Sequence, residues 1–183
     1  MPISALVIGY GSIGQRHVKI LNSLDLVSNV NILTSQKNLP FDSIESLDEI
    51  KSLNPDYIVI STPTAKHIEQ LSYIEKNFQE KKVLVEKPLF EKSYSFLPKK
   101  NSVWVAYCFR FDPIIELIKN KIKDRKIWNV NVFCGSFLPN WRSNIDYKDS
   151  YSASKKLGGG VLLDLSHELD YLHWFLGSLN LDY

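Results

Sequence analysis

The chain has 183 residues, of which 44% are hydrophobic and 23% charged, an ordinary composition for a soluble protein with one domain and part of another. Its net charge is +2 and its Lys and Arg residues form no dense stripe, which argues against a nucleic-acid partner. The two cysteines, Cys108 and Cys134, have neither metal-ligand spacing nor a disulfide pattern, so we expect two buried thiols and no metal site.

The first predicted element is a short apolar run, Ile3–Ile8, that leads into a glycine. No basic leader precedes this run, and it is too short for a signal peptide. No window of the sequence reaches the length of a membrane span. We therefore expect a cytoplasmic protein without a membrane partner.

Apolar runs then alternate with segments whose apolar residues recur at helical spacing. Continuous apolar runs are typical of strands buried on both faces of a parallel sheet. The predicted strands are Ile3–Ile8, Val30–Leu33, Tyr57–Ile60, Val83–Val85 and Val103–Ala106. The predicted helices are Ser12–Leu24, Ile44–Leu53, Lys66–Phe78 and Pro113–Ile122. This order implies right-handed crossovers and a doubly wound parallel sheet, an α/β fold of the Rossmann type.

The pattern changes after residue 122. Ile127–Phe137 is predicted as a long strand, Leu138–Leu157 as a polar loop, and Val161–Leu176 as a helix that follows three glycines. One strand, one loop and one helix cannot bury a core of their own. We therefore place an NAD(P)-binding domain at 1–122 and an incomplete α+β domain at 123–183.

The glycines after the first strand have the spacing of a dinucleotide-binding loop. Gly9 allows a tight turn, Gly11 leaves room for a pyrophosphate to approach the backbone, and Gly14 lets the helix pack against the strand. The helix that opens at Ser12 and Ile13 offers backbone N–H groups and a positive dipole end to the phosphates. The pattern predicts a dinucleotide site; the alternative is a glycine turn used only for packing.

The residues after the second strand bear on the choice between NAD and NADP. A carboxylate there would accept a hydrogen bond from the ribose 2′-hydroxyl of NAD. The chain instead has Thr34, Ser35, Gln36 and Lys37. Hydroxyls and a lysine can hold a 2′-phosphate or contact a plain ribose, so either cofactor is open, with a slight preference for NADP.

Further motifs follow the later strands in a definite order. They are Ser61–His67, Glu86–Pro88, Tyr107–Phe111, and Gly158–Gly160 with Asp164, His167 and Asp170. In combination these motifs resemble the Gfo/Idh/MocA family of sugar and cyclitol oxidoreductases. The stretches 138–142, 151–153 and 164–168 are similar to the branch of that family found in surface-glycan biosynthesis.

The resemblance implies hydride transfer between nicotinamide and a hydroxyl or ketone of a sugar or nucleotide sugar. It implies that Lys87 is the cation near the reacting oxygen and His167 the acid/base, with Asp164 beside it. The separation from Asp164 to His167 is three residues, where the common family pattern has four. From the residues alone, the alternatives are a solvated Glu86–Lys87 pair at a strand end and a structural histidine near a first helical turn.

The resemblance also suggests more peripheral site residues. Thr62, Pro63, His67 and Glu86 would join the cofactor site, although His67 is equally explained as a surface residue near a helix start. We expect Glu86 to pair with or orient Lys87, and the peptide bond before Pro88 to be cis. Arg110, Trp141 and Arg142 are the candidate sugar contacts, since Arg grips anions bidentately and Trp can stack on a sugar.

The resemblance extends only to the start of the family's second domain, whose large sheet builds the substrate wall. The last predicted helix has an apolar face made by five leucines. They are Leu162, Leu165, Leu169, Leu172 and Leu176. Without a sheet to cover it this face would be exposed, which predicts aggregation, a homo-oligomer or other partner, or reduced stability. An inactive dinucleotide-binding fragment and an NAD(P)-sensing regulatory or scaffold protein are the alternatives to an enzyme.

Overall fold

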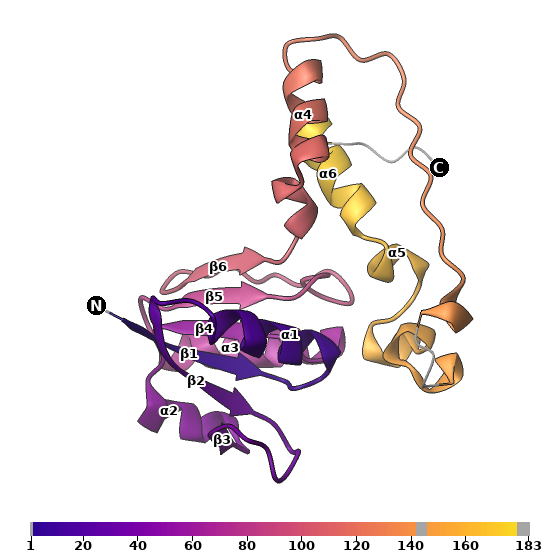
Figure 1. Cartoon of the computed structure of the whole chain (residues 1–183). Helices are drawn as coiled ribbons and strands as arrows, with labels where there is room; N and C mark the ends of the chain where they lie inside the picture. The colour runs from indigo at the N-terminus through magenta and orange to yellow at the C-terminus, as the bar shows by residue number, and fades with distance from the viewer. Residues whose placement is uncertain (1, 142–145, 179–183) are drawn as a thin grey trace. The chain divides into compact units, whose positions relative to one another are not determined.

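The computed structural model describes residues 2–141 and 146–178, and Figure 1 traces the whole chain. The chain forms two compact units, one that runs to Ala106 and one that begins at Tyr107. The helix predicted at Pro113–Ile122 belongs to the second of these units. The predicted division into a cofactor domain and a substrate domain at residue 122 stays a prediction.

The first unit is built on a six-stranded parallel sheet in the order β3-β2-β1-β4-β5-β6. The strands are β1 (Ile3–Ile8), β2 (Val27–Leu33), β3 (Ser43–Ile44), β4 (Tyr57–Ile60), β5 (Lys82–Val85) and β6 (Ser102–Val105). All five predicted strands are confirmed, and the order is that of a doubly wound Rossmann sheet.

Three α-helices belong to the first unit: α1 (Ser12–Leu21), α2 (Ile50–Leu53) and α3 (His67–Asn77). The single helix predicted at Ile44–Leu53 is wrong. The start of that stretch pairs with β2 as β3, and a capping box between Ser46 and Glu49 then opens a 3-10 turn, Leu47–Glu49, which continues into α2. Helical spacing did not reveal the strand because β3 is only two residues long.

The sheet is buried on both faces, as its continuous apolar strands predict. Alternate residues of β1 point to opposite sides: Leu6 and Ile8 join one apolar cluster with α2 and α3, while Ala5 and Val7 join another with α1. All four side chains are fully buried. The two clusters pack against opposite faces of the sheet and thereby hold the positions of its strands.

The second unit is helical in the part that the structure describes. Its α-helices are α4 (Pro113–Ile122), α5 (Val161–Asp164) and α6 (His167–Leu176). Its 3-10 turns are Cys108–Phe111, Leu138–Asn140, Tyr147–Asp149, Tyr151–Ala153 and Lys155–Leu157. The start of α4 agrees with its prediction because Asp112 caps it, accepting hydrogen bonds from the backbone of Ile114 (2.8 Å) and Ile115 (3.2 Å), with Pro113 at the first position.

Three predictions for the second unit are wrong. Residues 127–137 are extended but form no strand, because no strand among the described residues pairs with them. The helix predicted at Val161–Leu176 is interrupted at Leu165 and Ser166. Cys108 and Cys134 are exposed rather than buried, because they lie in a short turn and in the extended segment, outside both apolar clusters.

The leucine face of the last helices is only partly exposed. Leu162 is 73% exposed, and Leu169 and Leu176 are also exposed, whereas Leu165 and Leu172 are partly buried. Within residues 2–141 and 146–178, no helix is long and apolar enough to cross a membrane.

Candidate functional site

The carboxyl ends of four neighbouring strands lie in line at one edge of the sheet. Ile8 is in register with Leu33 on one side and Ile60 on the other, and Ile60 with Val85. Ladder hydrogen bonds continue into the residues that follow, with the Glu86 amide donating to the Ile60 carbonyl at 2.9 Å. The order of the strands reverses between β1 and β4, and ligands of open α/β sheets bind at such a reversal.

This edge brings together most of the predicted cofactor residues. They are Gly9, Gly11, Ser12, Ile13, Gly14, Thr34, Ser35, Thr62, Pro63, Glu86 and Lys87, all of which follow directly on β1, β2, β4 or β5. Residues far apart in the sequence therefore share one edge because the strands that carry them are parallel neighbours.

The glycine loop has the geometry that its spacing predicts. Gly9 has a φ of +96°, and a Cβ on Gly14 would lie 2.1 Å from the carbonyl oxygen of Gly9. The Ser61 hydroxyl, which lies beside both glycines, donates to the carbonyl oxygens of Ile8 (3.1 Å) and Gly9 (3.0 Å). Gly9 and Gly14 thus serve the turn and the close approach of α1 to β1.

Gly11 differs from the other two glycines. A Cβ placed on it would meet no atom within 4 Å, so packing alone does not explain a glycine here. Gly11 is the N-cap of α1, no side chain caps this helix, and its first turn holds no acidic residue. An open N-terminus of a ten-residue helix without a nearby carboxylate fits a pyrophosphate group.

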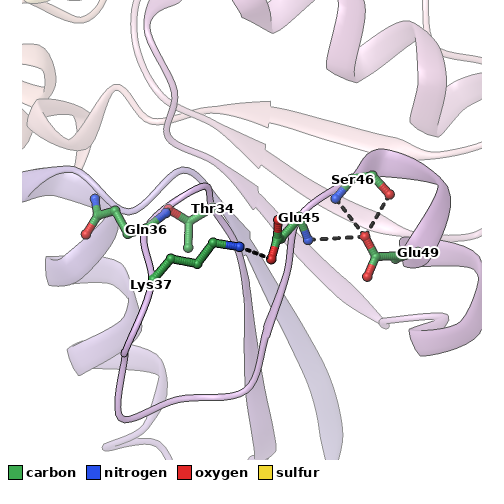
Figure 2. A network of polar contacts seen from close by, with 6 residues as sticks. All are labelled: Thr34, Gln36, Lys37, Glu45, Ser46 and Glu49. Atoms are coloured by element: carbon green, nitrogen blue, oxygen red, sulfur yellow. Dashed lines mark hydrogen bonds and ion pairs between the residues drawn. The ribbon is translucent and has the colours of Figure 1, made fainter.

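The loop after β2 carries the residues relevant to cofactor choice, and Figure 2 shows Thr34, Gln36 and Lys37 of this loop. Thr34 is buried, and its hydroxyl accepts a hydrogen bond from the Gln36 amide at 3.2 Å. The Gln36 side chain donates to the Tyr10 carbonyl of the glycine loop at 2.9 Å. The Lys37 ammonium forms an ion pair with Glu45, a carboxylate that sequence reasoning missed because it lies beyond the end of the next strand, β3.

Glu45 belongs to a small network at this end of the sheet (Figure 2). The Glu49 carboxylate accepts hydrogen bonds from the Ser46 hydroxyl (2.7 Å), the Ser46 amide (2.9 Å) and the Glu45 amide (3.2 Å). The hydrogen bond from the Ser46 side chain, helped by the two amides, lowers the pKa of the Glu49 carboxyl. The network holds the backbone of Glu45, whose side chain faces Lys37.

The loop after β5 carries Lys87. The Lys87–Pro88 peptide bond is cis, as predicted. The carboxylate of Glu86 lies 2.6 Å from the Nε2 of His17, a partner on α1 that sequence reasoning did not identify. Lys87 itself is half-buried.

His67 lies at the start of α3 and is 1% exposed, so the surface alternative for this residue is wrong. Its ring nitrogens contact backbone carbonyls of the loops after β4 and β5. In the same region the Thr62 hydroxyl donates to the side-chain oxygen of Gln70 at 2.7 Å. The cofactor role of His67 stays a prediction, and the contacts place this residue between two loops of the site.

In the second unit, His167 begins α6 and lies among aromatic side chains. Its ring stacks on Phe109, with centroids 4.3 Å apart and planes inclined by 19°, and meets the edge of Tyr107 at 5.7 Å. Burial raises the pKa of the Tyr107 hydroxyl. Neither aromatic residue was predicted to contact His167, although both belong to the motif at 107–111.

Asp164 and Asp170 take different local roles. Asp164 ends α5 and is buried, and its carboxylate accepts hydrogen bonds from the Ser152 hydroxyl and the Gly160 amide, each at 3.2 Å. The Asp170 carboxylate binds Arg110 bidentately, at 2.8 and 2.6 Å. The helical spacing assumed between Asp164 and His167 does not hold, because α5 ends at the first and α6 begins at the second.

The remaining predicted substrate residues are Arg110, Trp141 and Arg142. Arg110 is engaged with Asp170, and its guanidinium also lies 5.6 Å from the centroid of the Trp174 ring. Trp141 is partly exposed and its indole N–H donates to the Ser136 hydroxyl at 2.5 Å. Arg142 lies outside the described residues.

Several solved structures have the same fold. The WlbA dehydrogenase from Bordetella pertussis, solved with NADH and UDP-GlcNAcA, is 19% identical with a TM-score of 0.75, over 96% of this chain and 56% of that one. The scyllo-inositol dehydrogenase from Lactobacillus casei, solved with NAD(H) and scyllo-inositol, is 17% identical with a TM-score of 0.69, over 97% of this chain and 57% of that one. At these identities the likeness establishes the fold.

Sequence comparison agrees with the structural likeness. The Bacillus subtilis (strain 168) protein YteT is 25% identical over 151 residues, which are 77% of this chain and 35% of that protein. The chain thus spans about a third of this curated relative and little more than half of the solved chains it matches. Residues 3–95 match an oxidoreductase family with an NAD-binding Rossmann fold, over just more than half of the chain. The chain therefore belongs to the Gfo/Idh/MocA family of oxidoreductases.

Proposed function

We propose that this chain is the cofactor-binding part of an oxidoreductase that interconverts a hydroxyl and a ketone of a sugar or nucleotide sugar, in the biosynthesis of a surface glycan. The observation that carries the proposal is the shared edge of the sheet. There the open glycine loop after β1 and the Lys87 loop after β5 follow strands that flank β4. A protein that only senses a dinucleotide would need the first of these loops but not Lys87.

The residues of this chain have separate roles in the proposal. The glycine loop and the N-terminus of α1 hold the pyrophosphate. Thr34 and Ser35 border the ribose, and Thr62, Pro63 and Glu86 border the nicotinamide half. When bound, the nicotinamide supplies or accepts the hydride.

Lys87 and His167 carry the polar chemistry. The Lys87 ammonium stabilises negative charge that develops on the reacting oxygen, and the His167 imidazole takes up or returns the proton of that oxygen. Asp164 supports the acid/base site indirectly: its carboxylate accepts a hydrogen bond from the Gly160 amide and so holds the glycine turn before α5. The assignment of these three residues rests on the motif resemblance; Phe109 and Tyr107 support it by holding the His167 ring.

The substrate class rests on relatives of the same fold. The WlbA dehydrogenases were solved with UDP-GlcNAcA and the L. casei enzyme with scyllo-inositol. The resemblance of 138–142, 151–153 and 164–168 to the glycan branch favours a nucleotide sugar over a cyclitol. Trp141 and Arg142 remain the proposed sugar contacts, whereas Arg110 positions α6 through Asp170.

For the cofactor, we infer that NAD(H) binds at least as well as NADP(H). The slight preference for NADP rested on hydroxyls and on Lys37, and the charge of this lysine is offset by Glu45 (Figure 2). Both side chains are well exposed, so their ion pair contributes at most about 1 kcal/mol and a ribose phosphate can compete for the lysine. The chain is therefore not expected to exclude NADP(H).

The cofactor inference is tested by fluorescence titration of NADH and NADPH. Glu45→Gln should raise the affinity for NADPH relative to NADH by up to about fivefold, because it releases Lys37. Glu69→Gln, at an exposed carboxylate of α3 outside this network, is the control and should leave the ratio unchanged. An unchanged ratio in the Glu45 variant would show that Lys37 does not meet the ribose.

The reaction is tested by incubating the chain with NAD and either UDP-GlcNAcA or scyllo-inositol, and following the absorbance of reduced nicotinamide. Lys87→Ala and His167→Ala should each lower turnover at least a hundredfold while NADH still binds. His173→Gln, an exposed residue of α6, is the control. Cofactor binding without turnover would favour an inactive fragment or a sensor; absence of NADH binding would refute the proposal.

A further inference from the structure

We propose that His17 and His67 are positioning residues that hold Lys87 from its two flanking sides. The inference rests on the proposed function of Lys87, but the contacts that support it are independent of any ligand. His17 contacts the residue before Lys87, and His67 contacts the two residues after it. All of these residues belong to the first unit.

His17 anchors the segment before Lys87. Its Nε2 lies 2.6 Å from a carboxylate oxygen of Glu86, and the side chains of the pair are only 18% and 16% exposed. The Glu86 amide also donates to the Ile60 carbonyl of β4, so backbone and side chain of this residue are both held. His17 lies on α1, the helix that opens at Gly11, and the pair therefore links the predicted phosphate site to the Lys87 loop.

His67 anchors the segment after Lys87. Its Nδ1 lies 3.2 Å from the Pro88 carbonyl oxygen and 3.1 Å from that of Leu89, and its Nε2 lies 2.9 Å from the Thr62 carbonyl oxygen. The ring is almost fully buried. One side chain therefore joins the loop after β4 to the loop after β5.

The chemistry of these contacts explains why a histidine suits the position. Carbonyl oxygens only accept, and a buried carbonyl without a donor costs free energy. An imidazole has nitrogens on opposite sides of a flat ring and can present an N–H toward either loop. A neutral imidazole carries its N–H on one of the two nitrogens, so the tautomer decides which loop receives it; leucine would fill a similar volume but donate nothing, and glutamine would donate from a flexible chain.

The consequence is a chain of contacts across the sheet edge, from α1 through Glu86 to Lys87, and from Pro88 through His67 to Thr62. Lys87 lies at the centre of this chain. Fixed neighbours limit the positions that the Lys87 ammonium can sample, which is how positioning residues contribute to catalysis. A purely structural role of the two histidines would instead show in the stability of the whole unit.

The test measures the Lys87 loop directly, by amide hydrogen exchange of peptides that cover 86–91 and by the acylation rate of Lys87, both read by mass spectrometry. His17→Leu and His67→Leu should each raise exchange in 86–91 by about threefold to tenfold and change the acylation rate of Lys87, while exchange in β1 and β4 stays as in the unaltered chain. His67→Gln, which keeps one donor, should lie between the unaltered chain and His67→Leu.

Two controls connect the effect to the contacts. His173→Gln should change neither readout, since His173 is exposed and lies in the second unit. Adding Glu86→Gln to His17→Leu should add little to the effect of His17→Leu alone, because that variant already removes the contact between the two side chains. The proposal is overturned if exchange in 86–91 is unchanged in both histidine variants, or if it rises only in step with exchange in β1 and β4.

Activity gives a separate readout. In a chain that turns over substrate, the histidine variants should lower kcat several-fold with little change in the NADH dissociation constant. If the unaltered chain does not bind NADH, the proposed function fails, while the exchange and acylation results still decide whether the histidines hold Lys87.

Discussion

Different kinds of contact stabilise the interior of each of the two units of this protein. The first places apolar side chains on both faces of a parallel sheet, where two clusters bury them completely. The second unit has large apolar side chains that are exposed to solvent, among them Phe133 (97% exposed) and Trp128 (83% exposed). Its described long-range contacts are mainly polar or aromatic, such as the Arg110–Asp170 ion pair and the stack of His167 on Phe109.

This difference bears on how each unit positions its functional side chains. In the first unit the hydrogen bonds between parallel strands align the strand ends. Residues such as Lys87 are positioned because they directly follow one of these strands. In the second unit a side-chain contact sets the place of His167 at the start of α6. We therefore expect core substitutions to have larger effects in the first unit than apolar substitutions in the second.

The largest effect is expected for Ile58→Ala in β4, whose side chain is fully buried. The cavity should lower the free energy of unfolding by about 2–5 kcal/mol, measured by urea denaturation and circular dichroism. Leu162→Ala, at an exposed leucine of α5, should change it by less than about 0.5 kcal/mol. Similar losses for the two variants would contradict the contrast between the units.

A second large effect is expected for Gly14→Ala. The added Cβ would lie 2.1 Å from the Gly9 carbonyl, so α1 must shift from β1 at a cost of about 1–3 kcal/mol, and NADH binding should weaken as well. Gly11→Ala is the control: its Cβ has room, so stability should fall less than in Gly14→Ala, by the small cost of alanine at an N-cap, while NADH affinity falls. Equal stability of the two variants would argue against the close approach at Gly14.

A smaller effect is expected for Asp170→Asn in the second unit. The variant keeps the size of the side chain but loses the charge that Arg110 binds, and it should lower the free energy of unfolding of that unit by about 1 kcal/mol. Asp149→Asn, at an exposed aspartate of the same unit, is the control. Trp174 fluorescence should also change, because Arg110 lies over its ring. If neither stability nor fluorescence changes, the Arg110–Asp170 ion pair is not the contact that holds α6.

The smallest effect concerns pH and the first unit. Burial acts to raise the pKa of the Glu75 carboxyl, but hydrogen bonds from Asn101 and from the amides of Lys99 and Lys100 outweigh it and lower that pKa. The stabilisation is therefore present above the pKa of an unfolded glutamate and is lost as pH falls through the folded value. Glu75→Gln should cost less than about 1 kcal/mol at neutral pH.

The same comparison is then made at lower pH, where the difference between the unaltered chain and Glu75→Gln should shrink. Glu69→Gln, at an exposed position of the same helix, should show no such dependence. A difference that grows with acidification would contradict the lowered pKa.

Sequence periodicity determined much of the first unit. Five strands, the glycine loop and the helix that follows it were all predictable, because a strand buried on two faces must be apolar throughout and a pyrophosphate loop needs glycine at set steps. The motif order also predicted the family. The start of α4 was also predictable from local sequence, because Asp112 caps the helix and Pro113 occupies its first position.

Only the tertiary structure decided which distant residues meet. The pairs His17–Glu86 and Lys37–Glu45, and the contacts of His67 with two loops, depend on strand order and on the packing of helices, which local sequence does not encode. The break between Asp164 and His167 and the missing strand at 127–137 have the same cause. A periodic segment becomes a helix or a strand only where the rest of the fold supplies its partners.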